Sequence, residues 1–242
     1  MPNCVSYILD IIEKEKPTLI KVEHKRVPDN FEIEKAEKKI EYEIEYGGYL
    51  SGYVWSNMIQ SELIKNNNIS FRTDMKYGED ALFQYYVYLA LEQCDKVVSI
   101  RDIMYFYRMR SQSAMHSADE KAVSCQVECF INSARTYQVE YSSGKINDKN
   151  KLLATKRRMH MAIMNALTFM PGSDLDRKGT IKKLKKEKLY PFPMLWWHIR
   201  DARGIKGKLL ELTRNLFKFS FVYFIYYKLA KRSKIVKKHK KK

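Results

Sequence analysis

This sequence of 242 residues has few cysteines, which can cross-link a chain, and few prolines and glycines, which change its backbone freedom. It contains 4 cysteines, 6 prolines and 9 glycines. The cysteines, Cys4, Cys94, Cys125 and Cys129, have no spacing that suggests the disulfide framework of a small secreted protein. Cys125 and Cys129 share a predicted helix face, but no histidine or third cysteine completes a zinc pattern. We therefore predict no metal site, buried free thiols and a reducing, cytoplasmic location.

Long apolar runs are also absent. The N-terminus has no basic region followed by an apolar core, so no signal peptide is predicted. The most apolar stretch, residues 217–230, is interrupted by Lys218 and Lys228. It is shorter than the roughly 20 apolar residues that a transmembrane helix needs. We expect no membrane-spanning segment.

Acidic residues are the minority among the charged ones, with 28 Asp and Glu against 45 Lys and Arg, a formal net charge of +17. Such an excess indicates an anionic partner, which is nucleic acid, a phosphorylated ligand or an anionic membrane face. The sequence has no nucleic-acid recognition helix, zinc finger or RNA-binding signature, and the basic residues gather near the C-terminus, so we expect no nucleic acid. Hydrophobic residues make up 45%, enough for a folded core.

Hydrophobic periodicity divides the chain into two parts. The first 115 residues predict an α/β pattern, and the remainder predicts helices over 122–139 and 152–170. The elements predicted in the first part are an amphipathic helix that begins near Pro2 and stops before Pro17, strands over 18–22 and 69–71, a helix over 61–65, a helix from Glu79, and a strand pair or broken strand over 96–100 and 103–107.

Gly78, Glu79 and Asp80 form the most informative stretch. Gly78 allows a sharp turn, and the two carboxylates then fall in the first turn of the predicted helix, where free backbone amides and the helix dipole favour negative charge. Two interpretations are open at this point. The pair stabilises the helix start, or it presents a supported carboxylate to a substrate.

Several short motifs occur in a recognisable order. They are Val54-Trp55, Leu63-Ile64, Asn68-Ile69-Ser70-Phe71, Gly78-Glu79-Asp80-Ala81-Leu82-Phe83, and Tyr105-Phe106-Tyr107-Arg108 followed by Ser113. This set resembles the C-terminal half of bacterial family 2 glycosyltransferases, which are inverting enzymes of the GT-A fold. The resemblance covers about residues 1–115. It implies a partial GT-A-like (Rossmann-like) α/β domain over 1–117, followed by a helical extension over 118–200.

The resemblance also implies roles for particular residues. Asp80 matches the general base for the acceptor hydroxyl, Glu79 the residue that orients the acceptor, and Trp55 the aromatic under the acceptor site. Arg108 matches a basic position near the nucleotide phosphates. The remaining candidate substrate-binding residues are Ser113 and His116. On residue type alone, Trp55 is also compatible with a core position and Arg108 with a solvated surface position.

The implied partners are a nucleotide-sugar donor and a polysaccharide or lipid-linked glycan acceptor in bacterial surface polysaccharide (capsule) biosynthesis. In the family, Mg²⁺ or Mn²⁺ is held by an Asp-x-Asp motif in the preceding, nucleotide-binding half. The opening of this chain resembles the helix that follows that motif. We therefore expect the acceptor half without the Asp-x-Asp motif, and doubt that it is active alone.

Residues 201–242 are predicted to form a basic amphipathic tail on the inner face of the cell membrane. Aromatic and aliphatic residues alternate there with lysines, as in interfacial helices. A core-packed helix with a basic end is the alternative for this tail. For the whole chain, the alternative to a glycosyltransferase is a non-catalytic basic helical protein that binds an anionic membrane or nucleic acid.

Overall fold

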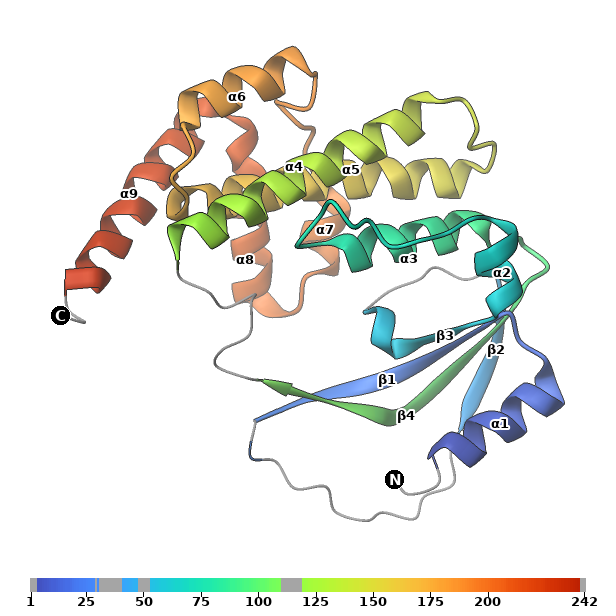
Figure 1. The fold of residues 1–242 in the computed structure, drawn as a ribbon. Coiled ribbons are helices and arrows are strands. Elements are labelled where there is room, and N and C mark those ends of the chain that lie inside the picture. The colour runs from blue at the N-terminus through green and yellow to red at the C-terminus, as the bar shows by residue number, and fades with distance from the viewer. Residues whose placement is uncertain (1–3, 29, 31–40, 48–52, 110–118, 240–242) are drawn as a thin grey trace. The chain divides into compact units, whose positions relative to one another are not determined.

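The computed structural model describes residues 4–28, 30, 41–47, 53–109 and 119–239 (Figure 1). The chain divides into two compact units. Unit 1 comprises Met1–Asp74 and Glu79–His116, and unit 2 comprises Met75–Gly78 and Ser117–Lys242. Unit 1 is mixed α/β, as expected for the first part of the chain, and the described residues of unit 2 form helices without strands.

Unit 1 is built on a four-stranded mixed sheet in the order β2-β4-β1-β3. The central strands β1 (Leu19–Pro28) and β4 (Lys96–Met109) are parallel, and β2 (Tyr42–Tyr46) and β3 (Asn57–Ile59) join them as antiparallel outer strands. A separate strand pair over residues 96–107 is not found, because β4 is one strand. The alternative, an irregularity between residues 100 and 103, is found: Val22 of β1 pairs with Ile100 and Glu23 with Ile103, so Arg101 and Asp102 interrupt the β1–β4 register.

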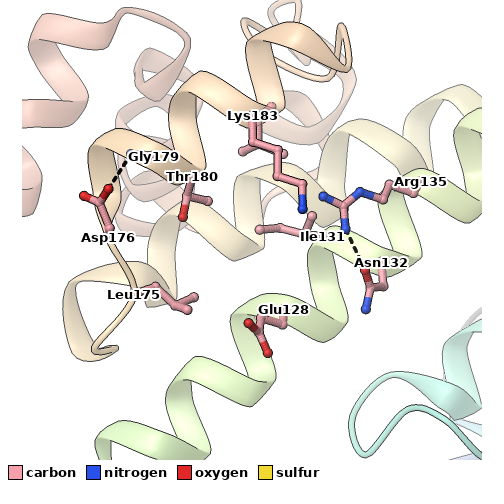
Figure 2. A pocket seen from close by; sticks show the side chains of 10 residues that line it. Glu128, Ile131, Asn132, Arg135, Leu175, Asp176, Gly179, Thr180 and Lys183 are labelled. Carbon is pink, nitrogen blue, oxygen red and sulfur yellow. Dashed lines mark hydrogen bonds between the residues drawn. The ribbon is translucent and has the colours of Figure 1, made fainter.

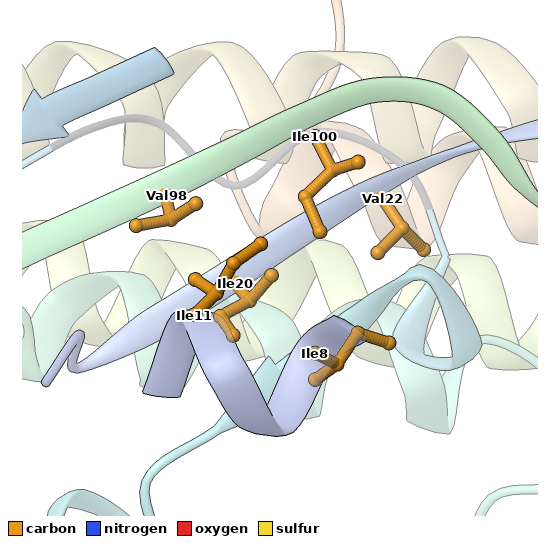
Figure 3. Close-up of a cluster of buried hydrophobic side chains, with 6 residues drawn as sticks. All are labelled: Ile8, Ile11, Ile20, Val22, Val98 and Ile100. Carbon is orange, nitrogen blue, oxygen red and sulfur yellow. The ribbon is translucent and has the colours of Figure 1, made fainter. Parts of the chain in front are cut away.

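The helix α1 (Cys4–Glu15) packs on one face of this sheet, and Figure 1 shows α3 (Glu79–Ala90) on the other side. Ile8 and Ile11 of α1 lie one turn apart and are buried. Strand residues that alternate in sequence point to one face, and four of them meet these isoleucines: Ile20, Val22, Val98 and Ile100 (Figure 3). Burying each such side chain contributes about 1.5–3 kcal/mol, which fixes α1 on the central strand pair.

Two features of unit 1 differ from the sequence prediction. Residues 69–71 form no strand, and they follow α2 (Ser61–Asn66) as irregular chain. The Phe71 ring stacks on Phe83 of α3, with 4.2 Å between centroids. The strand β2 was not predicted, although Tyr42, Ile44 and Tyr46 alternate with two glutamates.

Unit 2 begins with two long helices, α4 (Glu120–Ser142) and α5 (Lys149–Phe169), which pack against each other. They confirm the helices predicted over 122–139 and 152–170. Each has an aspartate N-cap. Asp119 accepts from the Ala122 amide, and Asp148 accepts from the Asn150 and Lys151 amides.

The rest of unit 2 is a series of shorter elements. They are η3 (Met170–Gly172), α6 (Arg177–Lys186), α7 (Trp196–Asp201), α8 (Gly204–Asn215), η4 (Leu216–Lys218) and α9 (Ser220–His239). The hydroxyls of Tyr223 and Tyr226 on α9 donate to the Leu167 and Thr168 carbonyls at the end of α5, each at 3.1 Å. In the part of the chain that the structure describes, no helix is both long enough and apolar enough to span a membrane.

The four cysteines are free thiols. Cys129 is buried, Cys4 and Cys125 are half-buried, and Cys94 is exposed. The prediction of buried free thiols therefore holds for Cys129 and is wrong for Cys94. Burial and the neighbouring Cys129 raise the pKa of the Cys125 thiol above its usual value, which keeps the Cys125 thiol protonated and unreactive at neutral pH.

Candidate functional site

Asp80 and Glu79 lie in the first turn of α3. Gly78, directly before them, has φ of +77°, a left-handed conformation that favours glycine. Both carboxylates are half-buried, and Asp80 Oδ1 accepts a 2.7 Å hydrogen bond from the Ala81 amide. The free amides and dipole of the helix start stabilise negative charge here. This placement is compatible with both interpretations of the acidic pair, helix stabilisation and catalysis.

Trp55 lies at the centre of a cluster of rings that we call the aromatic platform, formed by His24, Tyr53, Trp55, Tyr105 and Tyr107. The Trp55 ring stacks on Tyr53 at 4.8 Å, on Tyr105 at 4.3 Å and on Tyr107 at 5.3 Å between centroids. His24 meets the Trp55 ring edge-on at 4.8 Å. The platform belongs entirely to unit 1.

The platform follows from the register of the two central strands. His24 of β1 pairs with Tyr105 of β4, and Arg26 pairs with Tyr107. These two pairs are separated by the Lys25–Phe106 pair, so the four residues lie on the same face of the sheet. The short helix η1 (Val54–Ser56) carries Trp55 to the tyrosines. Two side chains from the same turn hold the Tyr53 carbonyl, the Ser56 hydroxyl at 2.7 Å and the Asn57 amide at 2.9 Å.

The platform is neither a closed core nor a bare surface. Trp55 is half-buried, and Tyr105 is 39% exposed. The Arg26 guanidinium donates a 2.5 Å hydrogen bond to the Tyr53 hydroxyl, which brings a cation to the edge of the rings. A partly exposed stack of this kind offers flat apolar faces with polar groups around them, a combination common in ligand sites.

The other predicted site residues are placed as follows. The helix α3, which carries Asp80, contacts η1, which carries Trp55. Arg108 is exposed near the end of β4, opposite Val27 of β1. Ser113 and His116 lie outside the described residues. The fold thus brings the elements that carry Asp80, Glu79 and Trp55 together within unit 1.

Sequence reasoning did not identify His24, Arg26 or Tyr53 as members of the site. The signal that the sequence carried was the alternation of Tyr105 and Tyr107, which share one face of a strand. The parallel pairing of β1 with β4 was needed to place His24 and Arg26 beside them.

The metal expectation needs one correction. The sequence does contain an Asp-x-Asp spacing at Asp174-Leu175-Asp176, in unit 2. The protein itself uses both carboxylates: Asp174 accepts from the Ser124 hydroxyl, and Asp176 caps α6 by accepting from the Lys178 and Gly179 amides. Among the described residues, no group of three or more His, Cys, Asp or Glu side chains is placed to hold a metal ion. The residues described here therefore do not fit the Mg²⁺ or Mn²⁺ that the resemblance implies.

Unit 2 has a separate pocket of about 490 Å³ between α4 and α6 (Figure 2). Charges of both signs line it, including Glu128, Arg135, Asp176 and Lys183. The Arg135 guanidinium binds both carboxylate oxygens of Glu187, each at 3.0 Å. Because the charges are mixed, this pocket does not select a ligand of one sign, and none of the predicted site residues line it.

Among solved structures, a distant similarity is found. This chain resembles S. aureus TarS 1-349, solved in complex with UDP-GlcNAc, with a TM-score of 0.44 and 13% sequence identity. The match covers 93% of this chain and 64% of that one, so this chain spans less than two thirds of its length. At this level of similarity, TarS does not define the activity of this chain. No protein-family model and no curated protein matches the sequence.

Proposed function

We propose that this chain is the acceptor-side part of an inverting glycosyltransferase of the GT-A type. Its donor is a nucleotide sugar, and its acceptor is a bacterial surface polysaccharide or a lipid-linked glycan. The observation that carries the proposal is the pairing, within unit 1, of a partly exposed aromatic platform with a contacting helix whose first turn holds two carboxylates. The order of motifs in the sequence supplies the reaction class.

The platform suits the acceptor. A sugar ring has C–H groups on its faces and hydroxyls around its edge, so it stacks on an aromatic face while its hydroxyls reach polar neighbours. Trp55 and Tyr105 supply ring faces, and His24 and Arg26 supply polar groups beside them.

Asp80 is the proposed general base. Its carboxylate takes the proton of the acceptor hydroxyl while that oxygen attacks the anomeric carbon of the donor. The bond from that carbon to the diphosphate breaks, the nucleoside diphosphate leaves, and the configuration inverts. Glu79 orients the acceptor, and Arg108 offers positive charge to the leaving diphosphate. Because the described residues do not fit a divalent cation, no step is assigned to one.

Acceptor binding is tested by titrating the intact chain with neutral and amino-sugar oligosaccharides, such as maltotetraose and chitotetraose, and following tryptophan fluorescence. We expect a saturable change that Trp55→Leu abolishes. Trp196→Leu is the matched control, since Trp196 is 66% exposed on α7 in unit 2. A response that Trp55→Leu retains would remove the platform from the site.

The role of Asp80 is tested in an enzyme completed with a nucleotide-binding half, by measuring release of nucleoside diphosphate from UDP-, GDP- and CDP-sugars. We expect Asp80→Asn to lower the transfer rate by about 10²–10⁴-fold, the usual cost of losing a general base. Oligosaccharide binding stays unchanged. Glu62→Gln, in the first turn of α2, is the control. Unchanged transfer by Asp80→Asn would exclude Asp80 as the base.

A further inference from the structure

The outer face of α9 is apolar and basic at once. Phe221, Ile225 and Leu229 follow one another at four-residue intervals and are 72%, 43% and 61% exposed. Residues spaced in this way lie on one side of a helix. Phe224, Lys228 and Arg232 form an adjacent exposed row with the same spacing. We call these two rows together the α9 outer face.

The opposite side of α9 is fixed within unit 2. Tyr223 is 1% exposed, and its hydroxyl and that of Tyr226 bind the last carbonyls of α5. A helix packed only for stability would turn its apolar residues inward. Here the inward side is already filled by tyrosines, while phenylalanine, isoleucine and leucine face outward. The row Phe221, Ile225 and Leu229 is therefore left exposed in unit 2, while Phe224 of the adjacent row is contacted by Arg177 of α6.

The charge around this face has one sign. From residue 212 to residue 242 the sequence contains eleven Lys and Arg and no Asp or Glu. Three cations lie over rings of α9: Lys228 is 4.9 Å and Arg177 5.0 Å from the Phe224 centroid, and Lys231 is 5.5 Å from that of Tyr227. Basic groups thus flank the exposed apolar side chains at close range.

We infer that the α9 outer face docks on the surface of an anionic lipid bilayer. Phe221, Ile225 and Leu229 enter the boundary between headgroups and acyl chains, and Lys228, Lys231 and Arg232 meet lipid phosphates. A nucleic acid would use the cations but leave the apolar side chains in water. A second copy packed face to face on α9 would bring like charges together. This inference does not depend on the proposed catalytic role.

The test uses the full chain and flotation with vesicles of phosphatidylglycerol and phosphatidylcholine. We expect binding to these vesicles, and much weaker binding to phosphatidylcholine alone or at high salt. Phe221→Ser with Ile225→Ser should weaken partitioning at least tenfold, because two apolar side chains no longer leave water. The matched control is Val139→Ser with Leu153→Ser, two exposed apolar residues on α4 and α5.

The basic residues are tested separately. Lys228→Gln, Lys231→Gln and Arg232→Gln together should weaken binding about 100-fold, since each cation near an anionic surface contributes on the order of 1 kcal/mol. The control changes the same net charge on α6 through Lys178→Gln, Lys182→Gln and Lys186→Gln, three exposed lysines. It should weaken binding less than about fivefold.

A reporter tests insertion directly. Phe221→Trp should be quenched by lipids brominated on the acyl chains, and Val139→Trp should not. Four results would overturn the inference: equal binding to neutral and anionic vesicles, equal losses in test and control variants, no quenching of Phe221→Trp, or a lipid-free dimer that Phe221→Ser with Ile225→Ser dissociates. Tight binding of a mixed-sequence RNA that survives that double change, without vesicle binding, would favour nucleic acid instead.

Discussion

At the scale of single residues, His160 on α5 makes the stability of unit 2 depend on pH. Its side chain is buried, and neither ring nitrogen has a hydrogen-bond partner among the described residues. Burial, with a smaller contribution from the positive charge of Lys156, lowers the pKa of His160 to about 4. The unfolded chain, with an ordinary histidine pKa of about 6.5, therefore binds this proton more readily than the folded one.

The sign of the effect follows from that order of pKa values. Above pH 6.5 both states are neutral and nothing is lost. As the pH falls from 6.5 toward 4, only the unfolded state gains the proton, so folding weakens by about 2 kcal/mol between pH 7.5 and pH 5. Urea unfolding followed by helix circular dichroism at the two pH values measures this. His160→Leu should remove that component, with little cost at pH 7.5 because no hydrogen bond is lost.

Lys156→Gln is the companion variant. It removes the smaller cause, so the pKa of His160 should rise and the loss between pH 7.5 and pH 5 should shrink without vanishing. A pH dependence that His160→Leu leaves intact would assign the effect to other groups.

The candidate site shows how far single residues can be predicted. Glu79 and Asp80 were placed correctly at a helix start, because a glycine followed by two acids is a local signal. Trp55 was identified by its motif, but its neighbours were not. His24 and Tyr107 are 83 positions apart in the sequence (107 − 24), and both contribute to the platform through the β1–β4 register. A local sequence pattern cannot predict how two strands so far apart in the chain align with each other.

At the scale of elements, the N-terminal cap of α6, Asp176, occupies space that a side chain at Gly179 would need. Asp176 caps the helix by accepting from the Lys178 and Gly179 amides at 3.0 Å and 2.8 Å. A Cβ atom at position 179 would lie 2.6 Å from Asp176 Oδ2. The cap and any side chain at position 179 therefore compete for the same space.

We expect Asp176→Ala to cost about 1 kcal/mol in the free energy of unfolding, as for other aspartate caps. Gly179→Ala alone should gain nothing or destabilise, because it displaces the cap. In the Asp176→Ala background the same change should stabilise by about 0.5–1 kcal/mol, since alanine is the better helix former. Urea titrations of the four proteins give this double-mutant cycle, and additive effects would contradict the competition.

The sequence predicts an element correctly where its apolar residues repeat with a regular spacing over many residues. The helices α4 and α5 carry apolar residues at three- and four-residue spacing over 23 and 21 residues, and both were predicted. Shorter segments were less certain. Two of residues 69–71 are apolar, as in a strand, but the Phe71 ring stacks on Phe83 of α3 and the segment pairs with no strand. The five residues of β2 lie in an acid-rich stretch, and so short an alternation of apolar and acidic residues is a weak strand signal.

At the scale of the whole molecule, the metal result leads to a prediction about donor binding under the proposed function. A GT-A donor is held through its diphosphate by a divalent cation, which needs carboxylate ligands. The described residues provide no such cluster, and Asp174 and Asp176 are already engaged. We expect titration calorimetry with nucleoside diphosphate sugars and Mn²⁺ to show no metal-dependent binding in the micromolar range. Micromolar binding that chelation of Mn²⁺ abolishes would contradict this.

The parallel pairing of β1 with β4 also sets the order of events during synthesis. The paired residues run from Leu19 with Val97 to Pro28 with Met109, a separation of 78 to 81 positions (97 − 19 and 109 − 28). On the ribosome, β1 therefore emerges long before β4. The earlier strand β3 can pair only with Leu19, Ile20 and Lys21, so Val22 and the rest of β1 have no strand neighbour until β4 follows. Closing so long a loop is slow compared with forming a helix. Until then, the nascent chain exposes one edge of β1, and such an exposed strand edge is a segment that chaperones bind and that aggregates when they are absent.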